Sequence, residues 1–224
     1  MLAVPVSGMA ASDKIIHLRE VLAERFPQTC AAPEQRLPTG VPAIDGAIGG
    51  GLPKSAITEL TSPNPSAGSA LLTHALLQEA HRRAFFLALV DGRDSFDPQS
   101  AAPTVLRNLL WIRCRAAADA VKAADFLLRD GNFPLVVLDL VLNAAEELRK
   151  IPQSNWYRLQ RLVEAAPTAF LVLTRQSIIS SAQLKLSLDN AWRLSDLEQT
   201  GLSSRLKIRV DRVHGAREII ARAG

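Results

Sequence analysis

The stretch at residues 57–72, ITELTSPNPSAGSALL, decides the predicted fold, because a buried strand, a tight loop and a helix start follow one another directly. This succession is the layout of a phosphate-binding loop with the pattern G-x-x-x-x-G-K-[ST]. Ser62 and Ala67 fall on the two glycine positions. Gly68 falls on the lysine position and Ser69 on the hydroxyl position. Three of these four residues lack the required group, so the sequence predicts the scaffold of a nucleotide site without its working groups.

The missing groups are those that hold phosphate. In a working loop the lysine reaches the β- and γ-phosphates, and backbone N–H groups close on them. Gly68 carries no charge, and a register shifted by one residue puts Ser69 on the lysine position, which restores none. Pro65 also removes one N–H, and Ser62 and Ala67 are strained wherever the loop needs a positive φ. The predicted degenerate site comprises Ser62, Pro63, Asn64, Pro65, Ser66, Ala67, Gly68 and Ser69.

Strand-like and helical stretches alternate around this loop. The predicted strands lie at 57–60, 85–90, 109–114, 135–141 and 169–174, and the predicted helices at 68–83, 117–129, 143–150 and 154–165. Continuous apolar strands are typical of a sheet whose two faces are both covered. The alternation therefore predicts an α/β fold with a mainly parallel sheet flanked by helices. Beyond it we expect a mobile polar loop at 175–183 and an antiparallel extension built from 184–188, 191–194 and 205–213.

An N-terminal arm is predicted to precede the core. Residues 1–36 combine a disordered lead, a helix over 13–26 and a linker rich in proline, and the core domain then occupies 37–224. Apolar residues at helical spacing give the helix one hydrophobic face, formed by Ile15, Leu18 and Leu22. This face is the predicted protein interface, on a second copy or another protein. Packing on its own core domain is the alternative.

Composition suits one ordinary domain, because 48% of the 224 residues are hydrophobic and 21% are charged. Cys30 and Cys114 have no metal or redox spacing, and the histidines have no metal-ligand spacing. We therefore expect free thiols, no metal and no cofactor. The N-terminus lacks a basic signal region, and no apolar run is long enough to span a membrane. These features predict a cytoplasmic protein without a membrane anchor.

The positive charge is concentrated at the C-terminal end. The net charge is +4, and residues 201–224 hold six basic and two acidic residues, which accounts for the whole excess. Strand alternation puts Leu206 and its apolar neighbours on one face of this segment and the basic residues on the other. A basic strand face is often merely solvated, but here it predicts contact with DNA phosphates. The candidate DNA-binding residues are Arg205, Lys207, Arg209 and Arg212.

Three segments carry a family resemblance. Residues 37–60, LPTGVPAIDGAIGGGLPKSAITEL, resemble the opening of the bacterial recombinase RecA core, and the likeness continues through LVDGRDSFDP (89–98) and FPLVVLDL (133–140). The resemblance implies a RecA-like P-loop fold. In RecA, a glutamate after the second core strand activates the attacking water, and its counterpart here is Arg93, which cannot act as a base. Asp139 matches the aspartate that assists the magnesium ion. Because the lysine and the glutamate are both missing, hydrolysis is still not expected.

A RecA-like chain with an eroded loop and a short N-terminal helix resembles the ImuA family. That resemblance implies a non-hydrolysing accessory or scaffold protein of bacterial damage-induced translesion DNA synthesis. The implied partners are a polymerase-like ImuB-type protein and an error-prone polymerase, with RecA, DNA and a second copy bound through the N-terminal helix as further candidates. Two alternatives stay open: a DNA-dependent ATPase that holds nucleotide through backbone groups and Asp139, and a regulator that modulates RecA filaments.

Overall fold

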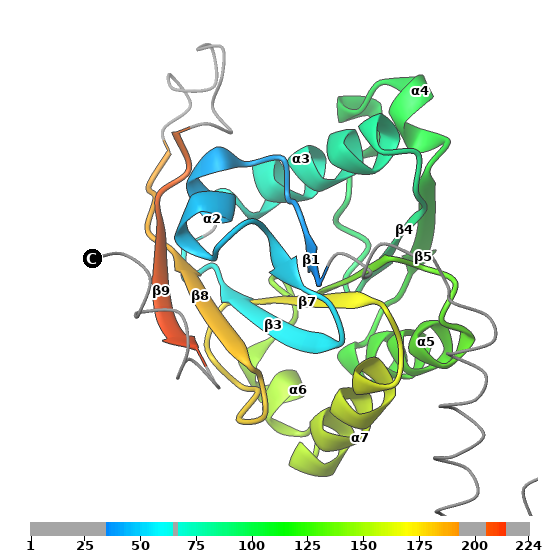
Figure 1. Ribbon diagram of the computed structural model, residues 1–224. Coiled ribbons are helices and arrows are strands. Elements are labelled where there is room, and N and C mark those ends of the chain that lie inside the picture. The colour runs from blue at the N-terminus through cyan, green and yellow to red at the C-terminus, as the bar shows by residue number, and fades with distance from the viewer. Residues whose placement is uncertain (1–34, 65–66, 193–204, 214–224) are drawn as a thin grey trace, which may run out of the picture. The chain divides into compact units, whose positions relative to one another are not determined.

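The computed structural model describes residues 35–64, 67–192 and 205–213 (Figure 1). Contacts divide the chain into two units, Met1–Glu34 and Gln35–Gly224, and the described residues all belong to the second. The break falls two residues before the predicted boundary. The interface residues proposed from the sequence, Ile15, Leu18 and Leu22, lie outside the described residues.

A seven-stranded sheet organises the described unit, in the spatial order β5-β4-β6-β7-β3-β8-β9. All neighbouring pairs are parallel except β8 and β9, which are antiparallel. The strands are β3 (Ala56–Thr61), β4 (Leu87–Asp91), β5 (Leu109–Arg113), β6 (Leu135–Asp139), β7 (Ala169–Thr174), β8 (Leu184–Leu188) and β9 (Ile208–Val213). A separate small antiparallel pair joins β1 (Arg36–Leu37) to β2 (Leu52–Pro53).

Helices cover both faces of the sheet (Figure 1). Figure 1 shows α2 and α3 on one side and α5, α6 and α7 on the other. The helices are α2 (Pro42–Ala47), α3 (Ser69–Arg82), α4 (Pro103–Leu106), α5 (Ala117–Asp130), α6 (Ala145–Arg149) and α7 (Gln153–Glu164), with a 3-10 turn at Pro98–Ser100. Gly131 ends α5 in the left-handed conformation, with φ of 70°, as a C-terminal glycine commonly does.

Two apolar clusters fill the space between the sheet and its helices. Alternate residues of the central strands enter each cluster, so that Leu89 of β4 packs toward α3 while Ala88 and Val90 pack toward α5. All three are fully buried. Each large apolar side chain buried in this way contributes about 1.5–3 kcal/mol relative to its exposed state. The predicted α/β fold with a mainly parallel, doubly covered sheet is thus confirmed.

The C-terminal extension differs from the prediction in two respects. The antiparallel pairing of β8 with β9 is confirmed, but β8 itself continues the parallel sheet beside β3, and the described residues 191–192 belong to no strand. The segment 175–183, predicted as a mobile loop, is a packed turn. Ile179 and Ala182 are fully buried in it, and buried Glu59 accepts hydrogen bonds from its backbone. The prediction was wrong because the partner that orders this polar segment lies far away in the sequence.

Within the described part of the chain, no helix is long and apolar enough to cross a membrane.

Candidate functional site

The carboxyl ends of the parallel strands bring the predicted site residues to one edge of the sheet. The loop at residues 62–68 follows β3, Arg93 follows β4, and Asp139 is the last residue of β6. One strand, β7, separates β3 from β6. Ligands of open α/β sheets bind outside the carboxyl ends of the strands, so a ligand site is expected at this edge.

The loop after β3 is bonded to the protein itself. The Ser62 N–H donates to the carbonyl of Thr174 at 2.7 Å, and the Ala67 N–H donates to the carbonyl of Asn64 at 3.1 Å. Ser62 and Ala67 are fully buried, and neither has a positive φ, so the strain expected from their side chains is not present. Pro65 and Ser66 lie outside the described residues. Two N–H groups that a phosphate cradle would offer to its ligand therefore already have partners.

Gly68, at the lysine position, is covered by the C-terminal segment. It caps α3 with φ of 105°, and a Cβ atom added there would lie 2.5 Å from Cδ2 of Leu206 and 3.3 Å from Nε1 of Trp192. Leu206 is only 2% exposed. The space where a lysine side chain would start toward phosphate is thus occupied by Leu206 and Trp192. Ser69 begins α3 beside this cover.

Asn190 joins the loop to the residues that cover it, Trp192 and Leu206, through hydrogen bonds on both sides. Its amide nitrogen donates to the carbonyls of Ala67, at 2.8 Å, and Lys207, at 3.1 Å. Its amide oxygen accepts from the Lys207 N–H at 2.8 Å. Three residues that the sequence analysis missed as site residues, Asn190, Trp192 and Leu206, therefore close the loop. The apolar face predicted for the last strand was a signal for burial of Leu206, but no pattern in the sequence indicated what it would bury.

A cavity of about 420 Å³ opens on the outer side of this cover. The Arg205 guanidinium carbon lies 5.5 Å from the centroid of the Trp192 ring, in a cation–π arrangement. The cavity is lined by Asp189, Asn190, Ala191, Trp192, Arg205 and Lys207.

Asp139, which the resemblance aligns with a magnesium-supporting aspartate, ends β6 beside Asp91 of β4. The pKa of Asp139 is raised to about 6, mainly by burial and also by the charge of Asp91, while the hydrogen bond from the Val141 N–H at 2.9 Å lowers it. Asp91 occupies the paired position of β4. It accepts bonds from the Ser95 and Phe96 N–H groups at 2.7 Å each, so it orders the loop that follows β4. Among the described residues no group of three potential metal ligands is found.

Arg93, which the resemblance aligns with the catalytic glutamate of RecA, contacts the backbone of a neighbouring loop. Its guanidinium is exposed and donates to the carbonyl of Arg115 at 2.9 Å. Asp94 pairs with Arg113 of β5 at 2.5 Å, and that bond lowers the Asp94 pKa. Asp97 caps the 3-10 turn through the Gln99 N–H.

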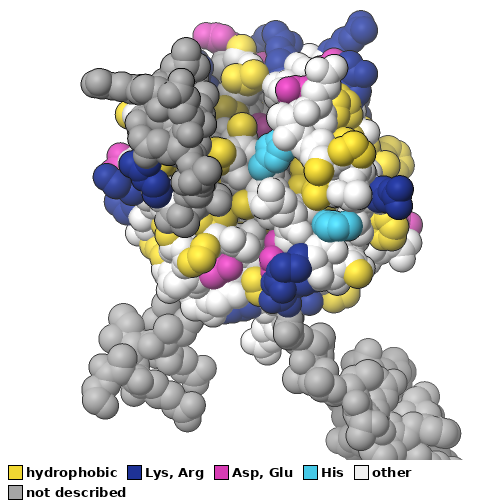
Figure 2. Space-filling model, turned by 90° about the horizontal axis from the view of Figure 1, so that it is seen from above, with side chains coloured by type: hydrophobic (Ala, Val, Ile, Leu, Met, Phe, Trp, Pro, Cys, Tyr) yellow, Lys and Arg dark blue, Asp and Glu magenta, His cyan; other side chains and the backbone are white. Residues whose placement is uncertain are grey.

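The basic residues proposed for DNA contact all lie near β9. Arg205, Lys207, Arg209 and Arg212 are exposed. Arg209 pairs with Asp211 at 2.7 Å, which takes up part of its charge. On the face that carries α3, Figure 2 shows lysine and arginine side chains scattered at the margin. Compared with that face, the β9 end is the better candidate for phosphate contact.

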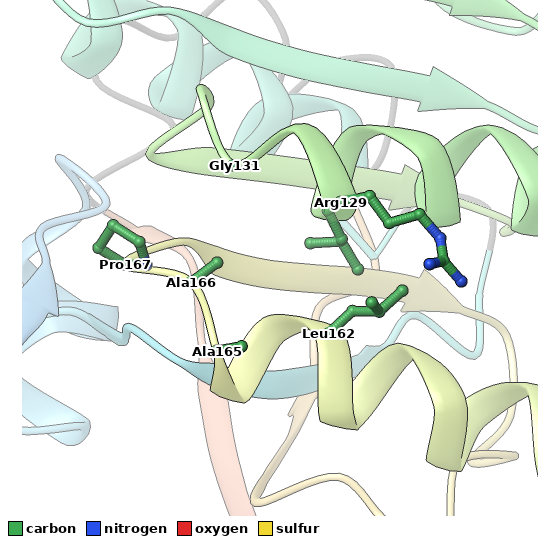
Figure 3. Close-up of a pocket in the computed structure, with 7 residues that line it drawn as sticks. Arg129, Gly131, Leu162, Ala165, Ala166 and Pro167 are labelled. Carbon is green, nitrogen blue, oxygen red and sulfur yellow. The ribbon is translucent and has the colours of Figure 1, made fainter. Parts of the chain in front are cut away.

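A second cavity of about 420 Å³ lies near the opposite edge of the sheet. Figure 3 shows Leu162 of α7 pointing toward α5, with Ala166 and Pro167 in the turn that follows α7. The guanidinium of Arg129 is the charged group at this cavity, and it is paired with Asp125 at 2.8 Å. A ligand site needs polar groups that converge on its occupant. Arg129 is the only polar side chain among the described lining residues and already has a partner, so this cavity is not the candidate site.

Comparison with known proteins agrees with the fold and the loop position. A model of the RecA N-terminal domain matches residues 25–151, which is more than half of the chain. The protein RecA of Clavibacter michiganensis subsp. michiganensis is 35% identical over 113 residues, covering 49% of this chain and 31% of that protein. RecA of Acidothermus cellulolyticus is 34% identical over 120 residues, covering 52% of this chain and 34% of that protein.

RecA of Frankia alni is 33% identical over 138 residues, covering 60% of this chain and 39% of that protein. The chain thus spans about a third of the length of the curated relatives it matches. The matched region contains β3, the loop that follows it, α3 and the strand that ends at Asp139. This chain belongs to the RecA N-terminal domain family.

Proposed function

We propose that this chain is a non-hydrolysing, RecA-like accessory protein of damage-induced translesion DNA synthesis, of the ImuA type. In this role it is a cytoplasmic scaffold that bridges a polymerase-like ImuB-type protein and an error-prone polymerase, and it contacts DNA through its basic end. It acts by binding rather than by catalysis.

The covered loop is the observation that carries this proposal. Leu206 and Trp192 occupy the space beside Gly68 where a phosphate-binding lysine would extend. Phosphoryl transfer on this fold depends almost wholly on positioning and charge stabilisation. Arg93 offers no base, and its guanidinium is bonded to the carbonyl of Arg115. These features favour a scaffold over a DNA-dependent ATPase, which would need an open loop and a base.

Nucleotide binding is the first test. Titration calorimetry with Mg-ATP, with and without single-stranded DNA, is expected to show no affinity tighter than about millimolar, which corresponds to roughly −4 kcal/mol. A coupled assay is expected to detect no phosphate release. A RecA protein with an intact loop, treated identically, is the control. Micromolar affinity would overturn the scaffold proposal in favour of the ATPase.

Partner binding is the second test, and it addresses the predicted helical arm. Replacing Leu18 and Leu22 together with aspartate puts two charges on the proposed apolar interface of Ile15, Leu18 and Leu22. Because buried charges without partners are costly, the double variant is expected to lose association at least about tenfold. A tagged wild-type chain recovered from DNA-damaged cells should retain the polymerase-like partners, and the variant should not.

The matched control replaces Arg19 and Glu20, which lie between the two leucines, with alanine. This change keeps the apolar stripe, so it should leave association intact. Thermal unfolding should show the 35–213 unit unchanged in both variants. If the double aspartate variant instead unfolds that unit, the helix packs on its own domain and the interface assignment is wrong.

A further inference from the structure

The cavity outside the covered loop combines an aromatic ring with two cationic side chains. Trp192, Arg205 and Lys207 all line it. Lys207 is exposed and forms no ion pair among the described residues, and the one acidic group on the lining is Asp189. A volume of about 420 Å³ falls in the range of small-molecule sites, which is about 300–1,000 Å³.

One edge of the Trp192 ring is buried against the loop after β3. Its Nε1 atom is buried, has no hydrogen-bond partner among the described residues, and lies beside Gly68. The neighbouring Asn190 is fixed by three hydrogen bonds to Ala67 and Lys207. A ring with one edge buried has less conformational freedom to lose when a ligand stacks on its exposed part.

The exposed part of the ring already accepts a flat polar group. The Arg205 guanidinium lies over it, with its carbon 5.5 Å from the ring centroid. Guanidinium planes and nucleobases stack on aromatic rings in the same manner. A base can therefore take the place of the guanidinium, which leaves Arg205 and Lys207 to meet the adjoining phosphate.

We propose that this cavity binds a single nucleotide with an unpaired base, stacked on Trp192 and paired through its phosphate with Lys207 and Arg205. The proposal rests on the DNA contact proposed above and makes it specific for single strands. A base inside a duplex is unavailable because its faces are stacked on neighbouring pairs, and extruding it is costly. Asn190 plays no part in reading the base, because both ends of its amide are already bonded.

Tryptophan emission of the full chain provides the test. A 12-residue oligothymidylate, a duplex of the same length and thymidine monophosphate are the three probes. We expect the oligothymidylate to change the emission, the duplex to leave it nearly unchanged, and the monophosphate to act only at millimolar concentration. The same titration of Trp192→Phe should show no emission change, although binding followed by anisotropy stays within about threefold, because phenylalanine still stacks.

Two further variants measure separately how the Trp192 ring and the Lys207 charge contribute to binding. Trp192→Ala should weaken binding of the oligothymidylate about 5- to 150-fold, as expected for the loss of one stacked base. Lys207→Ala should reduce the slope of log K against log[salt] by about 0.7. Circular dichroism and thermal unfolding check that each variant is folded. Trp192→Phe keeps the proposal testable if the alanine variant does not fold.

The outcomes distinguish the proposals. Binding of the oligothymidylate with unchanged emission, or equal affinity of wild type and a folded Trp192→Ala, overturns the stacking site and leaves the DNA contact standing. Tighter binding of the duplex also overturns it. If no probe binds at low salt, both the site and the DNA contact fall. Binding of the monophosphate as tightly as the oligonucleotide assigns the same site to free nucleotides.

Discussion

Replacing Gly68 with lysine is expected to lower the free energy of unfolding by about 2–5 kcal/mol and to confer no affinity for Mg-ATP. A simple sequence repair would predict a gain of function. The structure predicts the opposite, because the residue has φ of 105° and an added Cβ would lie 2.5 Å from Leu206 Cδ2. Urea unfolding measures the loss, and calorimetry with Mg-ATP measures the affinity.

Gly131→Lys is the matched control. Gly131 also has a positive φ, of 70°, but a Cβ there would meet nothing within 4 Å. It should therefore cost only the backbone strain, about 1–2 kcal/mol. If the two lysine variants are equally stable, Leu206 does not cover the loop. A second check measures the cost of Gly68→Lys in a protein that already carries Leu206→Ala. Because the smaller side chain leaves room for the Cβ atom, this cost should fall toward that of Gly131→Lys in the wild-type protein.

The sheet was predictable from the sequence because burial on both faces leaves a local signal. β4, β6 and β7 are apolar almost throughout, and α3, α5, α6 and α7 begin and end within a few residues of the predicted positions. The packed turn at residues 175–183 was not predictable in this way. Its order comes from Glu59, more than one hundred residues earlier, and a polar composition alone indicates a loop.

The candidate site shows the same division. The spacing of the loop and the position of Asp139 followed from the sequence, since each lies at the end of a recognisable strand. The residues that cover the loop could not be predicted from the sequence. Asn190 and Leu206 reach the loop only because β8 pairs in parallel with β3 and β9 returns beside β8. The ion pair of Asp94 with Arg113 was missed for the same reason, as it joins the loop after β4 to a neighbouring strand.

Glu59 lies in β3, between β7 and β8, and is fully buried. It pairs with Lys185 at 3.0 Å across the paired positions of β3 and β8. It also accepts bonds from the Ser177 hydroxyl at 2.9 Å and from the N–H groups of Ile178 and Ile179 at 2.6 and 3.0 Å. One carboxylate therefore satisfies a lysine and three further donors, and it fixes the turn at residues 175–183.

Glu59→Gln is expected to lower the free energy of unfolding by about 3–5 kcal/mol, because it leaves the ammonium of Lys185, only 17% exposed, without its counter-charge. Lys185→Met, which keeps the stem, should cost less, since Glu59 retains its three other donors. In the double variant the two losses should not add, and the difference should reveal a coupling of about 1–3 kcal/mol. Urea unfolding of all four proteins measures it, and amide exchange at Ile178 and Ile179 should accelerate in Glu59→Gln. A Glu59→Gln protein within about 0.5 kcal/mol of wild type would show that packing of Ile179, rather than the buried carboxylate, orders the turn.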